Sequence, residues 1–127
     1  MSLKSVLPSL LFLFVSFSSC SRFTEMQIQG NWIAAEVLQN NLPMENLPKE
    51  EIQLTFDNGK YEYNGTLKYK EAGHYSISTP YLYTTDTLKG KNEEKVVEIL
   101  NLASDSLELR MMQGEDELIL VMVRPRK

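Results

Sequence analysis

The stretch Gln29-Gly30-Asn31-Trp32-Ile33 holds the only tryptophan of this 127-residue chain, two residues after a glycine. It lies at the start of an apolar run, residues 28–38, that follows a short polar segment. Glycine lets the backbone turn tightly because it has no side chain to restrict φ. We therefore expect the chain to turn into its first strand here and to bury the indole.

Short segments with strand-type patterns make up the rest of the chain. Residues 51–56 alternate polar and apolar side chains, which is typical of a half-buried strand. Asp57-Asn58-Gly59 predicts a hairpin turn, since Asn and Gly accept positive φ. A short helical turn is possible within residues 42–51. The other predicted strands are residues 60–63, 66–69, 73–78, 81–84, 96–102, 107–111 and 118–123.

This close spacing of strands predicts an all-β fold, a small antiparallel up-and-down barrel of about eight strands. Closing the sheet into a barrel removes the exposed edges that an antiparallel meander would otherwise present. A mature chain with one cysteine can form no internal disulfide, so its core alone must hold the domain.

Four motifs follow one another in a familiar order: Gly30-Asn31-Trp32, residues 56–61, residues 73–77 and residues 105–110. The first looks like the Gly-x-Trp that opens lipocalins and the wider calycin group. The whole succession resembles the compact lipocalin-like domains of bacterial envelope lipoproteins, over residues 28–124. The chain is shorter than a full lipocalin and lacks that family's second and third motifs, apart from a late arginine.

The resemblance implies a role for three residues in closing the barrel. In such proteins the Gly-x-Trp tryptophan lies across the closed end, and a late arginine packs its guanidinium on the indole. Here Gly30, Trp32 and Arg124 occupy the matching positions. Arg110 is the alternative arginine, but inward-facing Leu107, Leu109 and Met111 would point it to solvent. On this interpretation Trp32 is a structural plug and does not contact a ligand.

The amino-terminal segment predicts export. Lys4 precedes an apolar block, residues 6–17, that is short for a bilayer span and has no cations directly after it. Phe17-Ser18-Ser19-Cys20 resembles the lipobox of bacterial lipoproteins, which implies cleavage before Cys20 and transfer of a diacylglycerol, with fatty acids such as palmitate, to its thiol. The alternative is an ordinary signal peptide with an incidental cysteine. The predicted organisation is a signal in residues 1–19, a tether in 20–27 and a barrel in 28–124.

Charge and the residues near Cys20 suggest where the domain resides. Cleavage would remove one of 13 basic residues and none of 17 acidic ones, so the side-chain balance becomes 12 − 17 = −5. An acidic domain without basic clusters argues against nucleic acid as a partner and against electrostatic docking on anionic lipid. Lipid on Cys20 would instead attach the domain to the membrane. Ser21 is not the aspartate associated with inner-membrane retention, so we expect the outer membrane, on its periplasmic side.

The sequence offers little for catalysis. It contains no Gly-rich phosphate loop, nucleophile elbow or metal-ligand spacing. His74 is the only histidine and is expected to face solvent from a strand. We therefore predict no enzyme activity, no cofactor and no metal.

Tyrosines suggest a binding role instead. Tyr61 and Tyr63 share one face of their strand, and Tyr81 and Tyr83 share one face of theirs. At the mouth of a barrel, these rings and Met111 would line a site for a small apolar ligand. Alternatively they pack across the sheet as ordinary strand residues. The rival function is a protein-interaction module, such as an envelope assembly accessory or an inhibitor, that has a filled interior and uses its loops.

Two short segments match an Asp-Ser/Thr-apolar pattern that some Gram-negative bacteria O-glycosylate in exported proteins. They are Asp86-Thr87-Leu88 and Asp105-Ser106-Leu107, so the candidate acceptors are Thr87 and Ser106. The alternative is ordinary turn chemistry, in which Asp and Ser bond to nearby backbone.

Overall fold

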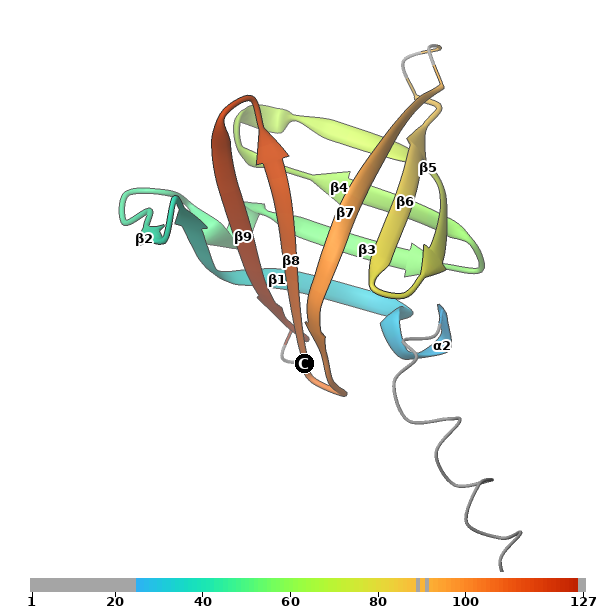
Figure 1. The fold of residues 1–127 in the computed structure, drawn as a ribbon, viewed down its shortest axis with the longest axis horizontal. Helices are drawn as coiled ribbons and strands as arrows, with labels where there is room; N and C mark the ends of the chain where they lie inside the picture. Colours follow the sequence, from blue (N-terminus) through green and yellow to red (C-terminus); the bar gives the residue numbers. More distant parts are fainter. Residues whose placement is uncertain (1–24, 89, 91, 126–127) are drawn as a thin grey trace, which may run out of the picture.

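The computed structural model describes residues 25–88, 90 and 92–125. These residues form one antiparallel sheet of nine strands that closes on itself (Figure 1). The two-residue β2 (Leu42–Pro43) pairs with β1 outside the ring, which leaves 9 − 1 = 8 strands in the barrel. These eight are β1 (Gly30–Gln39), β3 (Gln53–Asp57), β4 (Lys60–Asn64), β5 (Lys70–Ser78), β6 (Tyr81–Asp86), β7 (Glu93–Leu102), β8 (Ser106–Gln113) and β9 (Asp116–Val123). The prediction of an all-β up-and-down barrel is confirmed.

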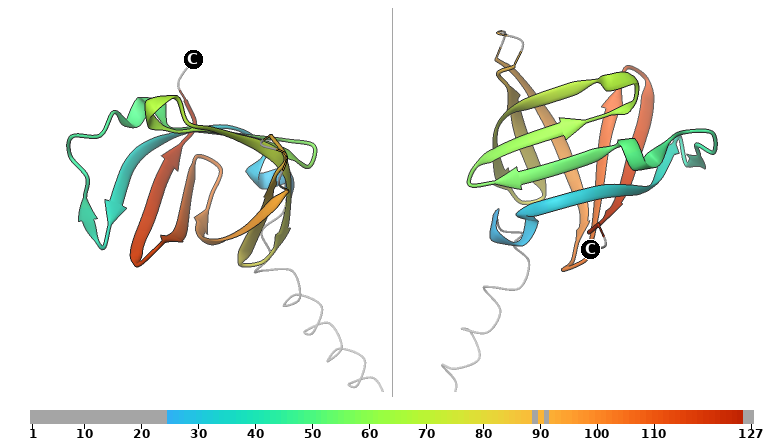
Figure 2. Two further views of the ribbon diagram at one scale, coloured as in Figure 1. Left: turned by 90° about the horizontal axis from the view of Figure 1, so that it is seen from above. Right: turned by 180° about the vertical axis from the view of Figure 1, so that it is seen from behind.

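Strand β1 closes the barrel by pairing with two partners. Its first residues pair with β3, with Gly30 opposite Phe56, and its later residues pair with β9, with Gln39 opposite Leu118. The register with β9 shifts between Ala34 and Glu36. Such a bulge bends and twists a strand, so β1 can leave β3 and follow β9 (Figure 2).

The turns divide the barrel into two ends. The closed end holds the start of β1 and the turns at residues 58–59, 79–80 and 104–105. The short helix α2 (Glu25–Ile28) also lies at this end (Figure 1). The open end holds the turns around residues 65–69, 87–92 and 114–115, together with the connection from β1 to β3.

Side chains that alternate inward from every strand form the core. In β3 the buried residues are Leu54 and Phe56, and the residues between and beside them are more exposed. The Phe56 and Tyr75 rings meet edge to face with centroids 4.8 Å apart, a favourable aromatic geometry. The largest fully buried side chains are Trp32, Phe56, Ile28, Leu82, Leu107, Leu109 and Met122.

The strand predicted over residues 66–69 is wrong. Residues Thr66–Lys68 form a 3₁₀ turn, η3, in which Leu67 and Lys68 have φ of 57° and 61°. Leu67 is almost fully exposed to solvent, at 94%. This segment is the loop that joins β4 to β5. The ladder between the two strands ends at the pair Asn64 and Lys70, so residues 65–69 lie outside it.

Among the residues that the structure describes, helical structure is limited to short pieces. A 3₁₀ turn, η2 (Lys49–Glu51), falls in the segment where a helical turn was expected. The last residues of the expected tether form α2 and lead into Ile28, which is fully buried. The rest of the tether and the predicted signal lie outside the described residues. Within the described part of the chain, no helix has the length and apolar character needed to span a membrane.

Candidate functional site

Arg124 and Trp32 meet at the closed end. The guanidinium carbon of Arg124 lies 3.7 Å from the centroid of the Trp32 ring. The indole Nε1 donates a hydrogen bond of 2.8 Å to the carbonyl of Ile28. Trp32 is therefore buried with its one polar atom satisfied, and the closed end offers a ligand no free indole edge.

The Arg124 guanidinium also donates hydrogen bonds to backbone carbonyls in two separate segments at the closed end. Its Nη1 donates to the Gln29 carbonyl at 2.7 Å, and its Nη2 donates to the Gln27 carbonyl at 3.2 Å. Its Nε donates to the Ser104 carbonyl at 3.3 Å. Burial lowers the pKa of Arg124, but a guanidinium keeps its proton in proteins. One cation thus joins the segment before β1 to the β7–β8 turn.

Gly30 makes room for this arginine. A Cβ on Gly30 would lie 2.7 Å from Arg124 Nη1, and the residue has φ of +111°. The backbone conformation therefore favours glycine, and any side chain here would also have to displace the Arg124 guanidinium. The alternative arginine, Arg110, pairs with Glu98 at 3.1 Å and Glu117 at 3.3 Å and keeps about half of its side chain in solvent.

A polar cluster lies inside the barrel toward the open end, and we call it the Glu71 cluster. Glu71 is only 6% exposed. Its carboxylate accepts hydrogen bonds from the Tyr61 hydroxyl at 3.0 Å and from the Tyr69 hydroxyl at 2.6 Å. It also accepts a hydrogen bond from Lys95 Nζ and forms an ion pair with it. The carboxylate is thus buried among three donors.

These contacts determine the charges inside the barrel. Burial alone would raise the pKa of Glu71, but hydrogen bonds from Lys95, Tyr69 and Tyr61 lower it below its usual range. Burial and the neighbouring carboxylate raise the pKa of Tyr61 far above its usual range. Burial opposes the charge of Lys95, but its bond to Glu71 raises its pKa. At neutral pH the cluster holds an ionised carboxylate, a protonated lysine and a neutral Tyr61.

Half-buried apolar side chains surround the core. Met44 and Leu47 from the β1–β3 connection, Tyr63 from β4 and Met111 from β8 pack against it. The rings of Tyr63 and Tyr69 meet edge to face with centroids 6.0 Å apart. At the open end, apolar surface therefore adjoins the Glu71 cluster.

Strand β6 places its two tyrosines on the wrong face for ligand lining. Its buried residues are Leu82, Thr84 and Asp86, so Tyr81 and Tyr83 point away from the interior. Tyr81 is 42% exposed, and its ring lies 6.4 Å from that of Tyr83. The expectation that these two rings line a barrel mouth is therefore wrong. Tyr61 and Tyr63 lie on the inner face of β4, as a lining role requires, and Met111 lies inward on β8.

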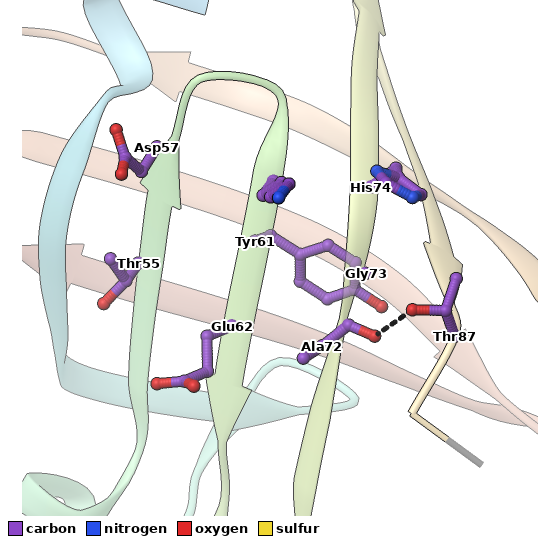
Figure 3. A pocket seen from close by; sticks show the side chains of 9 residues that line it. Thr55, Asp57, Tyr61, Glu62, Ala72, Gly73, His74 and Thr87 are labelled. Atoms are coloured by element: carbon purple, nitrogen blue, oxygen red, sulfur yellow. Dashed lines mark hydrogen bonds between the residues drawn. The ribbon is translucent and has the colours of Figure 1, made fainter.

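A shallow hollow of about 470 Å³ lies on the outer face of β3, β4 and β5 (Figure 3). His74 and Asp57 are among its lining residues, and His74 is exposed as expected. Gly73 lets neighbouring backbone approach here, because a Cβ on it would lie 1.8 Å from the Thr85 carbonyl oxygen. Among the residues that the structure describes, no group of three His, Cys, Asp or Glu side chains is placed to hold a metal.

The candidate modification sites have different surroundings. Thr87 is exposed after β6, and its Oγ1 lies 3.5 Å from the Ala72 carbonyl it donates to. Ser106 opens β8, is half-buried, and accepts a hydrogen bond of 3.2 Å from Asn101. The candidate lipidation site, Cys20, lies outside the described residues.

Sequence reasoning missed Glu71 and Lys95. Both are charged residues in polar stretches, which normally indicate a solvated face. One signal was available: Glu71 is four residues before Tyr75 in an extended segment, so the two share a face of β5. An inward Tyr75 therefore implies an inward Glu71.

Comparison with solved structures identifies the architecture. The chain is similar to a lipocalin-like protein from Bacteroides uniformis ATCC 8492, with a TM-score of 0.60 and 14% identity, over 78% of this chain and 99% of that one. The fold is lipocalin-like. At this identity the likeness extends to the fold alone. No family model matches the chain, and no curated protein matches it.

Proposed function

We propose that this lipocalin-like barrel is an envelope lipoprotein, anchored through lipid on Cys20, that binds a small apolar ligand at its open end. The observation that carries the proposal is the Glu71 cluster, placed inside the barrel beside half-buried apolar side chains. Binding is non-catalytic and needs no cofactor.

The two ends of the barrel support different roles. Trp32, Phe56 and Leu107 fill the closed end and are at most 1% exposed. Tyr63 and Met111 face inward but keep part of their surface accessible. An apolar ligand therefore gains most by entering between them, and the flexible thioether of Met111 adapts to its shape. Lys95, with 48% of its side chain exposed, offers a polar contact at the rim.

Matched double variants test this site. Tyr63→Ala with Met111→Ala removes inward surface, and Tyr83→Ala with Met112→Ala removes a similar outward surface. We expect the inner pair to weaken binding of the neutral apolar fluorophore N-phenyl-1-naphthylamine by about tenfold, a loss of about 1.4 kcal/mol. The outer pair should leave its binding unchanged. Equal titration curves for both pairs would place the ligand elsewhere.

The lipid anchor has its own test. Cys20→Ala removes the thiol that accepts the lipid, so cells given a clickable palmitate analogue should label the native chain and leave the variant unlabelled. Labelled Cys20→Ala protein would rule out the anchor. We place the native protein in the outer membrane, facing the periplasm. Removal of the domain by protease added to intact cells would contradict that placement.

A second candidate function is a protein-interaction module that uses the loops of the open end. Leu67 in the β4–β5 loop is 94% exposed, and Leu88 in the β6–β7 loop is 53% exposed. A photo-crosslinking amino acid at position 67 would then yield protein adducts in cells, and one at Met26, 84% exposed at the closed end, would not. Adducts at neither position would remove this candidate.

A further inference from the structure

We infer that the closed end of the barrel faces the membrane and that the open end, with the Glu71 cluster, faces away from it. This orientation rests on the proposed anchor at Cys20. The orientation also implies that a ligand reaches the barrel from the aqueous compartment and not from the bilayer that carries the protein.

The segment that leads toward Cys20 is fastened to the closed end. Hydrogen bonds join the carbonyls of three successive residues, Gln27, Ile28 and Gln29, to Arg124 or Trp32. Ile28 is fully buried. The chain therefore leaves the barrel at α2, beside the β5–β6 turn and far from the open-end loops (Figure 1).

The covalent reach of the tether is short compared with the barrel. Five Cα–Cα steps separate Glu25 from Cys20, which span roughly 17 Å at full extension. Strand β7 has ten residues, so it is roughly 33 Å long, and a tilt of about 40° leaves a barrel height of about 25 Å. A lipid on Cys20 cannot reach past the barrel to hold the open end against the bilayer.

The remaining alternative is a barrel that lies on its side. Tyr81, Val96 and Met112 form an outward apolar patch on β6, β7 and β8, and they are 42%, 51% and 64% exposed. Tyr83, which pairs with Val96, lies on the same face. The short attachment at α2 favours an upright barrel, which keeps this patch away from lipid. The patch would contact lipid only if the barrel lay on its side. The experiment must therefore separate upright, inverted and side-on arrangements.

Energy transfer from Trp32 to the bilayer separates them. Trp32 is the only tryptophan and lies at the closed end, and Cys20 is the only cysteine. The mature form that begins at Cys20 is coupled through this thiol to maleimide lipid in vesicles whose outer leaflet carries dansyl headgroups. Two reference conjugates, both with Cys20→Ser, are coupled through Asp105→Cys in the closed-end turn or Glu115→Cys in the open-end turn.

We expect transfer in the native conjugate to equal that of the Asp105→Cys reference and to exceed that of the Glu115→Cys reference. Transfer equal to the Glu115→Cys reference, or midway between the two, would overturn the orientation. Circular dichroism before coupling verifies that each variant is folded, and both substitutions lie in exposed turns. Because the coupling is chemical, this result is independent of lipidation in cells, which the palmitate label tests separately.

Discussion

The guanidinium of Arg124, just after the last strand, lies on the face of Trp32 in the first strand, 3.7 Å from the ring centroid. This contact joins the two ends of the barrel sequence at the point where β1 and β9 close the sheet. Both residues also bind the carbonyls that precede β1. Closure of the barrel and attachment of the amino-terminal segment therefore depend on the same two side chains.

Trp32→Ala should reduce the free energy of unfolding by about 3–5 kcal/mol, because it removes the largest buried side chain at the closed end. Urea denaturation followed by circular dichroism measures this loss. Tyr81→Ala is the control and should change stability by less than about 1 kcal/mol, since Tyr81 is 42% exposed. A Trp32→Ala protein with an unchanged midpoint that loses only fluorophore binding would instead make Trp32 a ligand contact.

Replacing each arginine by glutamine should have very different effects. Arg124→Gln loses the indole contact and hydrogen bonds to three carbonyls, so we expect a loss of about 2 kcal/mol or more. Arg110→Gln removes ion pairs of a half-exposed side chain, for which about 0–1 kcal/mol is usual. Thermal denaturation of the two variants side by side makes the comparison. Equal shifts in Tm would show that the Arg124 contacts do not stabilise the barrel.

Removal of two buried tyrosine hydroxyls should change the stability of the barrel by different amounts. Tyr61→Phe takes a donor from the buried Glu71 carboxylate and should cost about 1–3 kcal/mol. The Tyr75 hydroxyl is buried and forms no well-aligned hydrogen bond with the described residues, so Tyr75→Phe should be neutral or slightly stabilising. Equilibrium unfolding in urea measures both. A costly Tyr75→Phe would mean that this hydroxyl is hydrogen-bonded in solution.

The Glu71 cluster should make stability depend on pH at both extremes. The pKa of Glu71 is lowered in the folded state, so its contribution is fully present above its ordinary value of 4.5 and is lost as pH falls through the folded value. The pKa of Lys95 is raised, so its contribution is fully present below 10.5 and is lost as pH rises through the folded value.

Glu71→Gln should therefore be less stable than the native chain at pH 7 and should lose less stability on acidification. Chemical denaturation at a series of pH values measures both effects. Glu62→Gln is the matched control, because Glu62 is exposed and its partner Lys70 lies 3.7 Å away. Acid profiles of the same slope for native and Glu71→Gln protein would show that another carboxylate causes the dependence.

The barrel could be predicted from the sequence because its strands and turns depend on local patterns. Period-two alternation and the Asn58-Gly59 turn fix a strand and a hairpin within a few residues. Gly30, Trp32 and Arg124 were assigned by resemblance to lipocalins, and the structure brings all three together. The sequence predicted only that Gly30 allows a tight turn into the first strand, and its φ of +111° fits that expectation.

Which residues of β5, β6 and β7 face inward toward the open end was decided only by the tertiary structure. In β6 the alternation puts Tyr81 and Tyr83 on one face and Thr84 and Asp86 on the other. Because the tyrosines are the more apolar pair, the sequence favours their face as the inner one. The structure buries Thr84 and Asp86 instead. The sequence specified the period of each strand, but polar residues inside the barrel concealed its phase. Closure of the sheet selects that phase, because it brings hydrogen-bond partners from distant strands to side chains that would otherwise remain in water.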